Sequence, residues 1–296
     1  MKENSFQEFI NKLNVQIPSE EEFEKLGDLT ALFKTQSDNF IRLNYERGML
    51  LYAIIARYKP KNIIEFGTAS GYATLCMARA MDDYKIDGRI FTIDIESERQ
   101  SFERPIDWGF GPKMEKISRK ELWNKVAKKN WLNKIEVLRG YSAEIMSNKK
   151  LPKFQFAYID GPHFFKGVQH DFYSFLKVAD SEFFVLFDDY ISRPSYGVKK
   201  LVDNEINDYF NPILIHTDRK RYILEMNLTT DPKYGMVWIN SNDVKKSLDS
   251  LFTNGNLDKI IKKYRKYEKR LKLRGKINQK IPFLKKIRFQ YWKNKN

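Results

Sequence analysis

The sequence has one cysteine in 296 residues, three histidines and no long apolar run. One cysteine excludes a disulfide framework and any zinc site built from several cysteines, so a reducing, intracellular compartment is expected. The longest apolar stretch, residues 49–56, is far too short to cross a bilayer, and residues 1–15 lack the continuous apolar region of a signal peptide. We therefore expect a cytoplasmic protein, either soluble or peripheral at the inner face of the membrane.

Positive charge is concentrated at one end of the chain. The formal net charge is +15, and residues 256–296 hold sixteen Lys or Arg against two acidic residues, so the remaining chain is close to neutral. Apolar residues recur at helical spacing from Leu257 to Leu271, which predicts a basic amphipathic helix with an aromatic end beyond Gly275. This tail could pack on the body or on a second subunit of a homo-oligomer, or it could bind an anionic membrane. Cationic and aromatic residues also suit nucleic acid, although that is not the partner we expect.

A short apolar strand followed by two glycines is the central feature of the sequence. Residues 62–66 predict a buried strand, and a helix pattern begins near Gly71. Glycines at a strand-to-helix turn allow a ligand to approach the backbone, where the helix start offers free N–H groups. The spacing is Gly-x-x-x-Gly, so the pyrophosphate fingerprint of dinucleotide enzymes is incomplete. The simpler alternative is a βα turn that binds nothing.

Acidic residues follow several of the predicted strands. Asp94 ends the strand at residues 89–95, where a carboxylate can accept both hydroxyl protons of a ribose or can cap the next loop. Asp160 follows the strand at 154–159, and Asp188 and Asp189 follow the strand at 182–187. Since the carboxyl ends of parallel strands share one crevice, the last three should converge, and a divalent cation such as Mg²⁺ would balance their charge. Loop capping is the alternative for Asp188 and Asp189.

The combination of motifs resembles a known family. Glu65-x-Gly67-x-x-x-Gly71-Tyr72, Asp160-Gly161-x-His163 and Asp188-Asp189, with Asp94 between them, look like the macrocin and cephalosporin-biosynthesis group of class I O-methyltransferases, which use S-adenosylmethionine (SAM). More distantly, they are similar to catechol O-methyltransferases. The resemblance covers about residues 44–240. It implies a Rossmann-like, doubly wound seven-stranded α/β sheet, mostly parallel with an antiparallel edge strand.

The resemblance also implies roles for individual residues. Asp160, Asp188 and Asp189 would hold the metal. The expected SAM-binding residues are Glu65, Gly67, Ser70, Gly71, Tyr72, Asp94, Ser142 and Asp160.

The catalytic base is the point at which the chain departs from the family pattern. Many sugar-modifying relatives carry a second acid two residues after the first metal aspartate, and Pro162 stands there instead. His163 falls where catechol enzymes place a lysine base, and imidazole accepts a proton well near neutral pH. We therefore expect His163 and Asp160 to be the catalytic residues, and we expect His170 and His216 to be structural.

Three regions are expected along the chain. Residues 1–41 form an N-terminal helical lid, with helices at residues 5–14 and 19–33. A helix at residues 42–58 then begins the methyltransferase domain, which covers residues 42–241. Residues 96–117 predict a long loop on the substrate side, and residues 221–226 and 236–239 predict an antiparallel edge pair. Residues 242–296 form the basic helical tail.

The function expected from these features is Mg²⁺-assisted, SAM-dependent O-methylation of a sugar, a glycan or another small polyol or natural product. Two alternatives stay open. One is an RNA methyltransferase that uses the basic tail, and the other is a non-catalytic membrane-surface or scaffold protein on the same fold.

Overall fold

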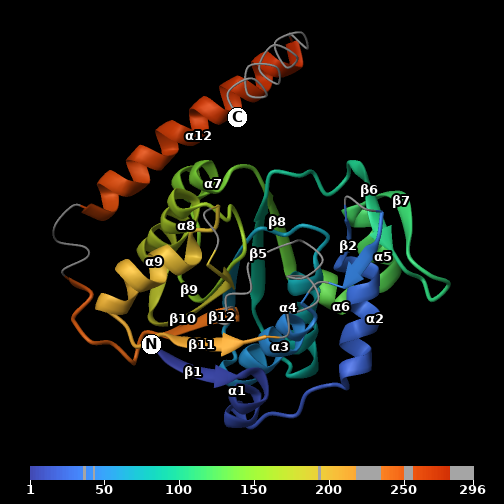
Figure 1. The fold of residues 1–296 in the computed structure, drawn as a ribbon, viewed down its shortest axis with the longest axis horizontal. Coiled ribbons are helices and arrows are strands. Elements are labelled where there is room, and N and C mark those ends of the chain that lie inside the picture. The colour runs from blue at the N-terminus through green and yellow to red at the C-terminus, as the bar shows by residue number, and fades with distance from the viewer. Residues whose placement is uncertain (36–37, 43, 193–194, 218–234, 250–255, 281–296) are drawn as a thin grey trace.

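The computed structural model describes residues 1–35, 38–42, 44–192, 195–217, 235–249 and 256–280. A large mixed sheet forms the centre of the molecule (Figure 1). In spatial order its strands are β1 (Lys2–Ser5), β11 (Ile213–His216), β12 (Gly235–Asn240), β10 (Ala179–Tyr190), β9 (Phe154–Ile159), β4 (Asn62–Phe66), β5 (Arg89–Asp94) and β8 (Ile135–Arg139). Two hairpins lie outside it, β2 (Leu32–Lys34) with β3 (Phe40–Arg42) and β6 (Ser101–Ile106) with β7 (Lys113–Ser118).

Helices cover both faces of the sheet. One apolar cluster contains buried residues of α1, α2, α3, α4 and α6, and a second contains buried residues of α7, α8 and α12. The central strand β4 contributes Ile63 to the first cluster and Ile64 to the second, because successive side chains of a strand point to opposite faces. The helices are α1 (Phe6–Leu13), α2 (Glu20–Thr30), α3 (Glu46–Tyr58), α4 (Tyr72–Asp83), α5 (Arg119–Val126), α6 (Lys129–Leu132), α7 (Ser142–Asn148), α8 (Phe165–Val178), α9 (Val198–Asn204) and α12 (Asn256–Lys280), with a 3₁₀ turn at Ile206–Asp208.

The doubly wound α/β fold predicted from the sequence is confirmed, with two differences in the sheet. The antiparallel strand β12 pairs with β10 and β11, so it lies inside the sheet and not at its edge. One edge of the sheet is β1, which pairs in parallel with β11 and gives the sheet an eighth strand; the other edge is β8. The first residues of the expected helical lid therefore belong to the sheet itself. Residues 221–226, expected as the partner of β12, lie outside the described part of the chain.

Local signals place most of the helices correctly. Ser19 and Glu22 form the capping box that opens α2, in agreement with the expected start at Ser19. The expected end at Phe33 is wrong, because α2 stops at Thr30 and β2 begins at Leu32. Residues 96–117 are also not a plain loop, because β6 and β7 form a hairpin there. Alternation of side chains along these short strands is weak, so the sequence did not indicate them.

The basic C-terminal helix α12 packs against α8 and α7. Its end extends away from the sheet (Figure 1, orange to red). Among the described residues, no helix combines the length and the apolar character needed to cross a bilayer. The expected aromatic end of the tail, residues 281–296, lies outside the described residues.

Candidate functional site

The turn between β4 and α4 has the backbone that the glycine spacing predicts. Gly67 and Gly71 have φ angles of +92° and +99°, which residues with a Cβ rarely adopt. A Cβ on Gly67 would lie 2.2 Å from the carbonyl oxygen of Asp160, and one on Gly71 would lie 2.3 Å from Nε1 of Trp123. Both glycines are therefore required for close packing of the turn against β9 and α5.

Asp94 organises this turn from the end of β5. Its Oδ2 accepts hydrogen bonds from the backbone N–H groups of Thr68 (3.2 Å) and Ala69 (2.9 Å). The fully buried Arg119 donates to the same oxygen at 3.2 Å. Its other oxygen, Oδ1, accepts from the backbone N–H of Glu96 at 2.8 Å, so Asp94 also caps the loop that follows it, which is the alternative that the sequence left open. The residue lines the cavity described next as well.

A cavity of about 420 Å³ opens at the carboxyl ends of the central strands. A site at this edge of the sheet is where open α/β folds bind their ligands. Four expected cofactor residues line it, namely Gly67, Asp94, Ser142 and Asp160. The remaining lining comes from Phe66, Ala69, Ile93, Ile95, Gly140, Tyr141, Gly161, Pro162, Phe164, Asp171, Tyr264, Glu268 and Leu271.

Four other expected cofactor residues support the turn without lining this cavity. Glu65 is fully buried and accepts a hydrogen bond of 2.5 Å from Thr74 Oγ1. Burial raises the pKa of Glu65 to about 7. Ser70 accepts a hydrogen bond from Arg104 at 2.8 Å, and Tyr72 is buried with its hydroxyl donating to the carbonyl of Tyr45 at 2.7 Å. The fourth residue, Gly71, packs against Trp123.

Ser142 belongs to a buried polar network beside the cavity. Its hydroxyl donates to Asp171 Oδ1 at 2.6 Å, and the same oxygen lies 3.0 Å from Nδ1 of the fully buried His170. The His170 ring stacks on Tyr264 of α12 with centroids 4.4 Å apart. His170 therefore has a structural role, as expected, in a network that ends at the cavity wall.

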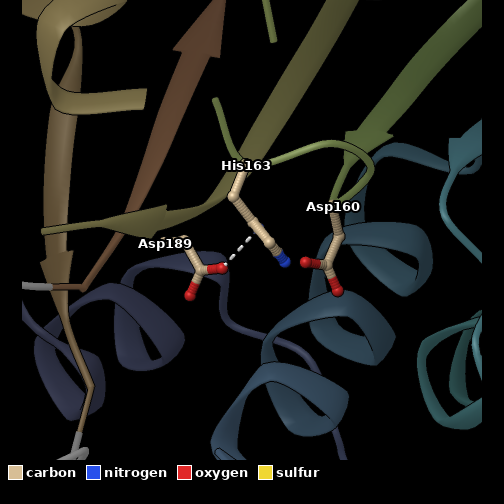
Figure 2. Close-up of side chains that lie close together, drawn as sticks. All are labelled: Asp160, His163 and Asp189. Carbon is tan, nitrogen blue, oxygen red and sulfur yellow. Dashed lines mark ion pairs between the residues drawn. The ribbon is translucent and has the colours of Figure 1, made fainter. Parts of the chain in front are cut away.

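A cluster of two carboxylates and an imidazole lies at the ends of β9 and β10. One ligand atom each from Asp160, His163 and Asp189 lies within 4.8 Å of the others. Nδ1 of His163 is 2.8 Å from Oδ2 of Asp189. Figure 2 shows the His163 ring between the two carboxylates. Because Asp160 also lines the cavity, the cluster adjoins it.

Asp188 is not part of this cluster, although it was expected in the metal site. Its buried carboxylate accepts hydrogen bonds from the hydroxyl of Tyr158 at 3.0 Å and from Arg47 at 3.3 Å. Adjacent side chains of a strand point to opposite sides, and Asp189 has a left-handed backbone with a φ of 59°. Asp188 therefore shares Arg47 with Asp160, whereas Asp189 pairs with His163.

Arg47 is the residue of this site that the sequence did not indicate. It lies in α3, and its Nη1 is 3.4 Å from Asp160 Oδ2 and 3.3 Å from Asp188 Oδ2. Its guanidinium balances part of the negative charge of Asp160 and Asp188, a role that we expected a cation to fill. No motif marks this position, because only packing of α3 under the strand ends brings Arg47 to the two carboxylates.

The spacing of the ligand atoms of Asp160, His163 and Asp189 is compatible with a divalent cation. Oxygen and nitrogen ligands lie about 2.0 to 2.2 Å from such an ion, so ligand atoms up to roughly 4.4 Å apart can share it. The cluster is close to this spacing. Carboxylates suit Mg²⁺, and the imidazole also admits Mn²⁺ or Zn²⁺.

Comparison with known proteins supports the assignment of the fold. Residues 64–190 match the family described as a methyltransferase domain. No curated protein sequence matches the chain.

Three solved structures resemble this one at low sequence identity. An O-methyltransferase from Bacillus cereus, in complex with SAH, is 15% identical, with 79% of this chain and 96% of that chain covered and a TM-score of 0.46. The O-methyltransferase TomG from Streptomyces achromogenes, in complex with SAM, is 16% identical over 80% and 95% of the two chains, with a TM-score of 0.49. CalS11, a TDP-rhamnose 3′-O-methyltransferase, is 14% identical over 80% and 94%, with a TM-score of 0.45.

The family match covers the two glycines of the turn, Asp94, and the cluster at the ends of β9 and β10. The strand order places all of them at one edge of the sheet. Residues 64–190 therefore match a methyltransferase domain, and this stretch contains both the glycine turn and the side-chain cluster beside the cavity.

Proposed function

We propose that the protein transfers the methyl group of SAM to a hydroxyl of a sugar, a glycan or another small polyol, with help from a divalent cation. The observation that carries this proposal is the position of the Asp160, His163 and Asp189 cluster next to the cavity. Oxygen nucleophiles need a proton acceptor, and a polyol offers neighbouring oxygens to a cation.

Residues of this chain can accept the proton that the acceptor hydroxyl must lose. Asp189 accepts a hydrogen bond from the Nδ1–H of His163, which leaves Nε2 as the atom that takes the proton of the acceptor hydroxyl. Asp160 lies between this group and the cofactor cavity, so it orients the acceptor toward the methyl group. Alignment of the two reacting atoms supplies much of the acceleration.

A cation at this cluster would be held by the carboxylates of Asp160 and Asp189, while His163 keeps its role as the base. When bound, it would lower the pKa of a coordinated hydroxyl. Asp188 would then act through Arg47 and Tyr158, in place of the direct metal contact first expected.

The test is release of S-adenosylhomocysteine (SAH) from SAM in the presence of sugars, glycolipids and catechols, with Mg²⁺, Mn²⁺ or EDTA. We expect turnover with at least one polyol and its loss in EDTA. Turnover that survives EDTA would remove the cation from the proposal, and binding of SAM without transfer to any hydroxyl would overturn O-methylation.

A matched pair of histidine variants tests the base. His163→Gln should lower kcat about 100-fold or more, because general-base catalysis supplies roughly 10² to 10⁴. His216→Gln is the control, since His216 of β11 pairs at 2.9 Å with Glu3 of the edge strand β1, away from the cluster. Equal activity of the two variants would contradict the role of His163.

We also propose that the tail contacts an anionic membrane surface. The α12 side chains Lys259, Lys262, Lys263, Lys266, Lys269 and Arg270 are exposed. The proposal is supported by the concentration of charge in this segment, since lysine and arginine near an anionic leaflet each favour binding.

A further inference from the structure

The basic helix α12 forms one wall of the cofactor cavity. Tyr264, Glu268 and Leu271 line the same cavity as Gly67 and Asp94. They are spaced four and three residues apart, so they lie on one face of the helix. All three lie outside residues 64–190, where the methyltransferase family matches.

Several specific contacts hold α12 in this position. Leu257 and Tyr264 are buried against the body. Both acidic residues of α12 contact the body too, since Asp258 pairs with Lys177 and Glu268 accepts from the backbone N–H of Ala143 at 3.1 Å. Lys272 adds an ion pair with Glu144 at 2.6 Å. The helix is therefore docked by matched polar and apolar groups.

The order of the strands fixes which end of a nucleoside ligand meets α12. Along the sheet, Asp160 follows β9, Gly67 follows β4, Asp94 ends β5, and residues 140–142 follow β8. The transferred methyl group must lie at the Asp160 end, beside the cluster. A ribose at Asp94 then directs the base toward the end of β8, where α7 begins and α12 crosses it.

The side chains at this end suit a purine with an amino group. Ile95, Tyr141 and Leu271 offer apolar and aromatic surface to a flat base. Glu268 is 5% exposed and lines the cavity. A carboxylate has about four acceptor positions, so it can hold the N–H of Ala143 and still accept another donor. The exocyclic amine of adenine is such a donor.

We propose that α12 is part of the cofactor site and that Glu268 recognises the adenine amine of SAM. This inference rests on the proposed use of SAM. It gives the basic tail a role in cofactor binding that its composition does not suggest. Binding of the cofactor is then coupled to docking of α12. A partner that binds only the undocked helix lowers the affinity for the cofactor, and the cofactor lowers the affinity for that partner by the same factor.

The test compares two ligands by calorimetry, SAH and S-inosylhomocysteine, in which a carbonyl replaces the adenine amine. The wild-type chain should bind SAH at least about tenfold more tightly, because the carbonyl would face a carboxylate. In Glu268→Gln the amide can donate to that carbonyl, so the preference for SAH should fall about tenfold or reverse.

Two further variants separate recognition from docking. Asp258→Asn makes the same change of charge on the same helix away from the cavity, so its ligand preference should equal the wild type. Leu271→Ala should weaken both ligands by a similar factor and leave their ratio unchanged. Thermal unfolding of each variant checks that the fold is retained.

The outcomes distinguish the two proposals. If the wild-type chain binds SAH and Glu268→Gln keeps both the affinity and the preference, the role of α12 in recognition is wrong and the proposed function stands. If the wild-type chain binds neither ligand, the proposed function fails and this inference fails with it.

Discussion

At the scale of single residues, the backbone of Gly67 admits no side chain. Its φ is +92°, and a Cβ would meet the backbone carbonyl of Asp160 at 2.2 Å. Gly109, at the tip of the β6–β7 hairpin, has a similar φ of +97°, and a Cβ added there would have no described atom within 4 Å. Comparing substitutions at these two glycines therefore separates the free-energy cost of a left-handed backbone from the cost of a steric clash.

We expect Gly109→Ala to lower the free energy of unfolding by about 1 kcal/mol, the cost of a left-handed backbone. Gly67→Ala should cost more, because the neighbouring backbone must also move, and it should abolish SAH binding. Urea denaturation and calorimetry measure the two effects. Equal stability of the variants would show that the turn has room for a methyl group.

Glu65 makes the free energy of unfolding depend on pH. Burial raises its pKa from 4.5 to about 7, so the folded state holds a proton that the unfolded state releases. Stability should therefore fall as the pH rises from about 4.5 to 7, and the loss is complete above 7. The cause is the carboxylate of a fully buried side chain.

Glu65→Gln should remove this dependence. Relative to the wild type, the variant should gain about 2 kcal/mol between pH 5 and pH 8. Urea denaturation at both pH values measures the gain, with the exposed Glu103→Gln as the control. A constant difference between Glu65→Gln and the wild type across this range would contradict the raised pKa.

At the scale of elements, α3 brings a positive charge to the ends of β9 and β10. Arg47 contacts both Asp160 and Asp188, and Asp188 is 2% exposed. Removing one partner of a buried charge pair leaves the other charge uncompensated. The helix thus supplies part of the positive charge that balances the carboxylates at the strand ends.

Arg47→Met should lower the free energy of unfolding by about 3 kcal/mol. It should also make stability depend more strongly on Mg²⁺ or Mn²⁺, because a cation would replace the lost charge. Melting temperatures with the ion and with EDTA measure this effect. Arg57→Met, at the exposed end of the same helix, is the control, and an identical response of both variants would argue against a cation at this cluster.

At the scale of the whole molecule, a nearly neutral body carries a strongly basic helix. The inner face of α12 lines the cavity, and its outer face carries exposed lysines. One helix therefore combines a cofactor-binding face with a charged surface.

Replacing Lys262, Lys263 and Lys266 by Gln should weaken binding to anionic vesicles by up to about 3 kcal/mol, or roughly 1 kcal/mol per residue. SAH affinity should stay the same, because these side chains do not line the cavity. Sedimentation with phosphatidylserine vesicles at two salt concentrations measures the change. Unchanged partitioning of the variant would contradict a membrane role for this surface.

The sequence by itself determined the strand-turn-helix at Gly67 and the strands that end at Asp94 and Asp160. These features depend on hydrophobic periodicity and on glycines with positive φ angles, and both can be recognised within a short segment of sequence. Only the tertiary structure decided that β1 joins the sheet, that Asp188 contacts Arg47 while Asp189 contacts His163, and that Glu268 lines the cofactor cavity. Each of these contacts joins residues far apart in the chain, so it depends on packing and side-chain direction, which no local pattern contains.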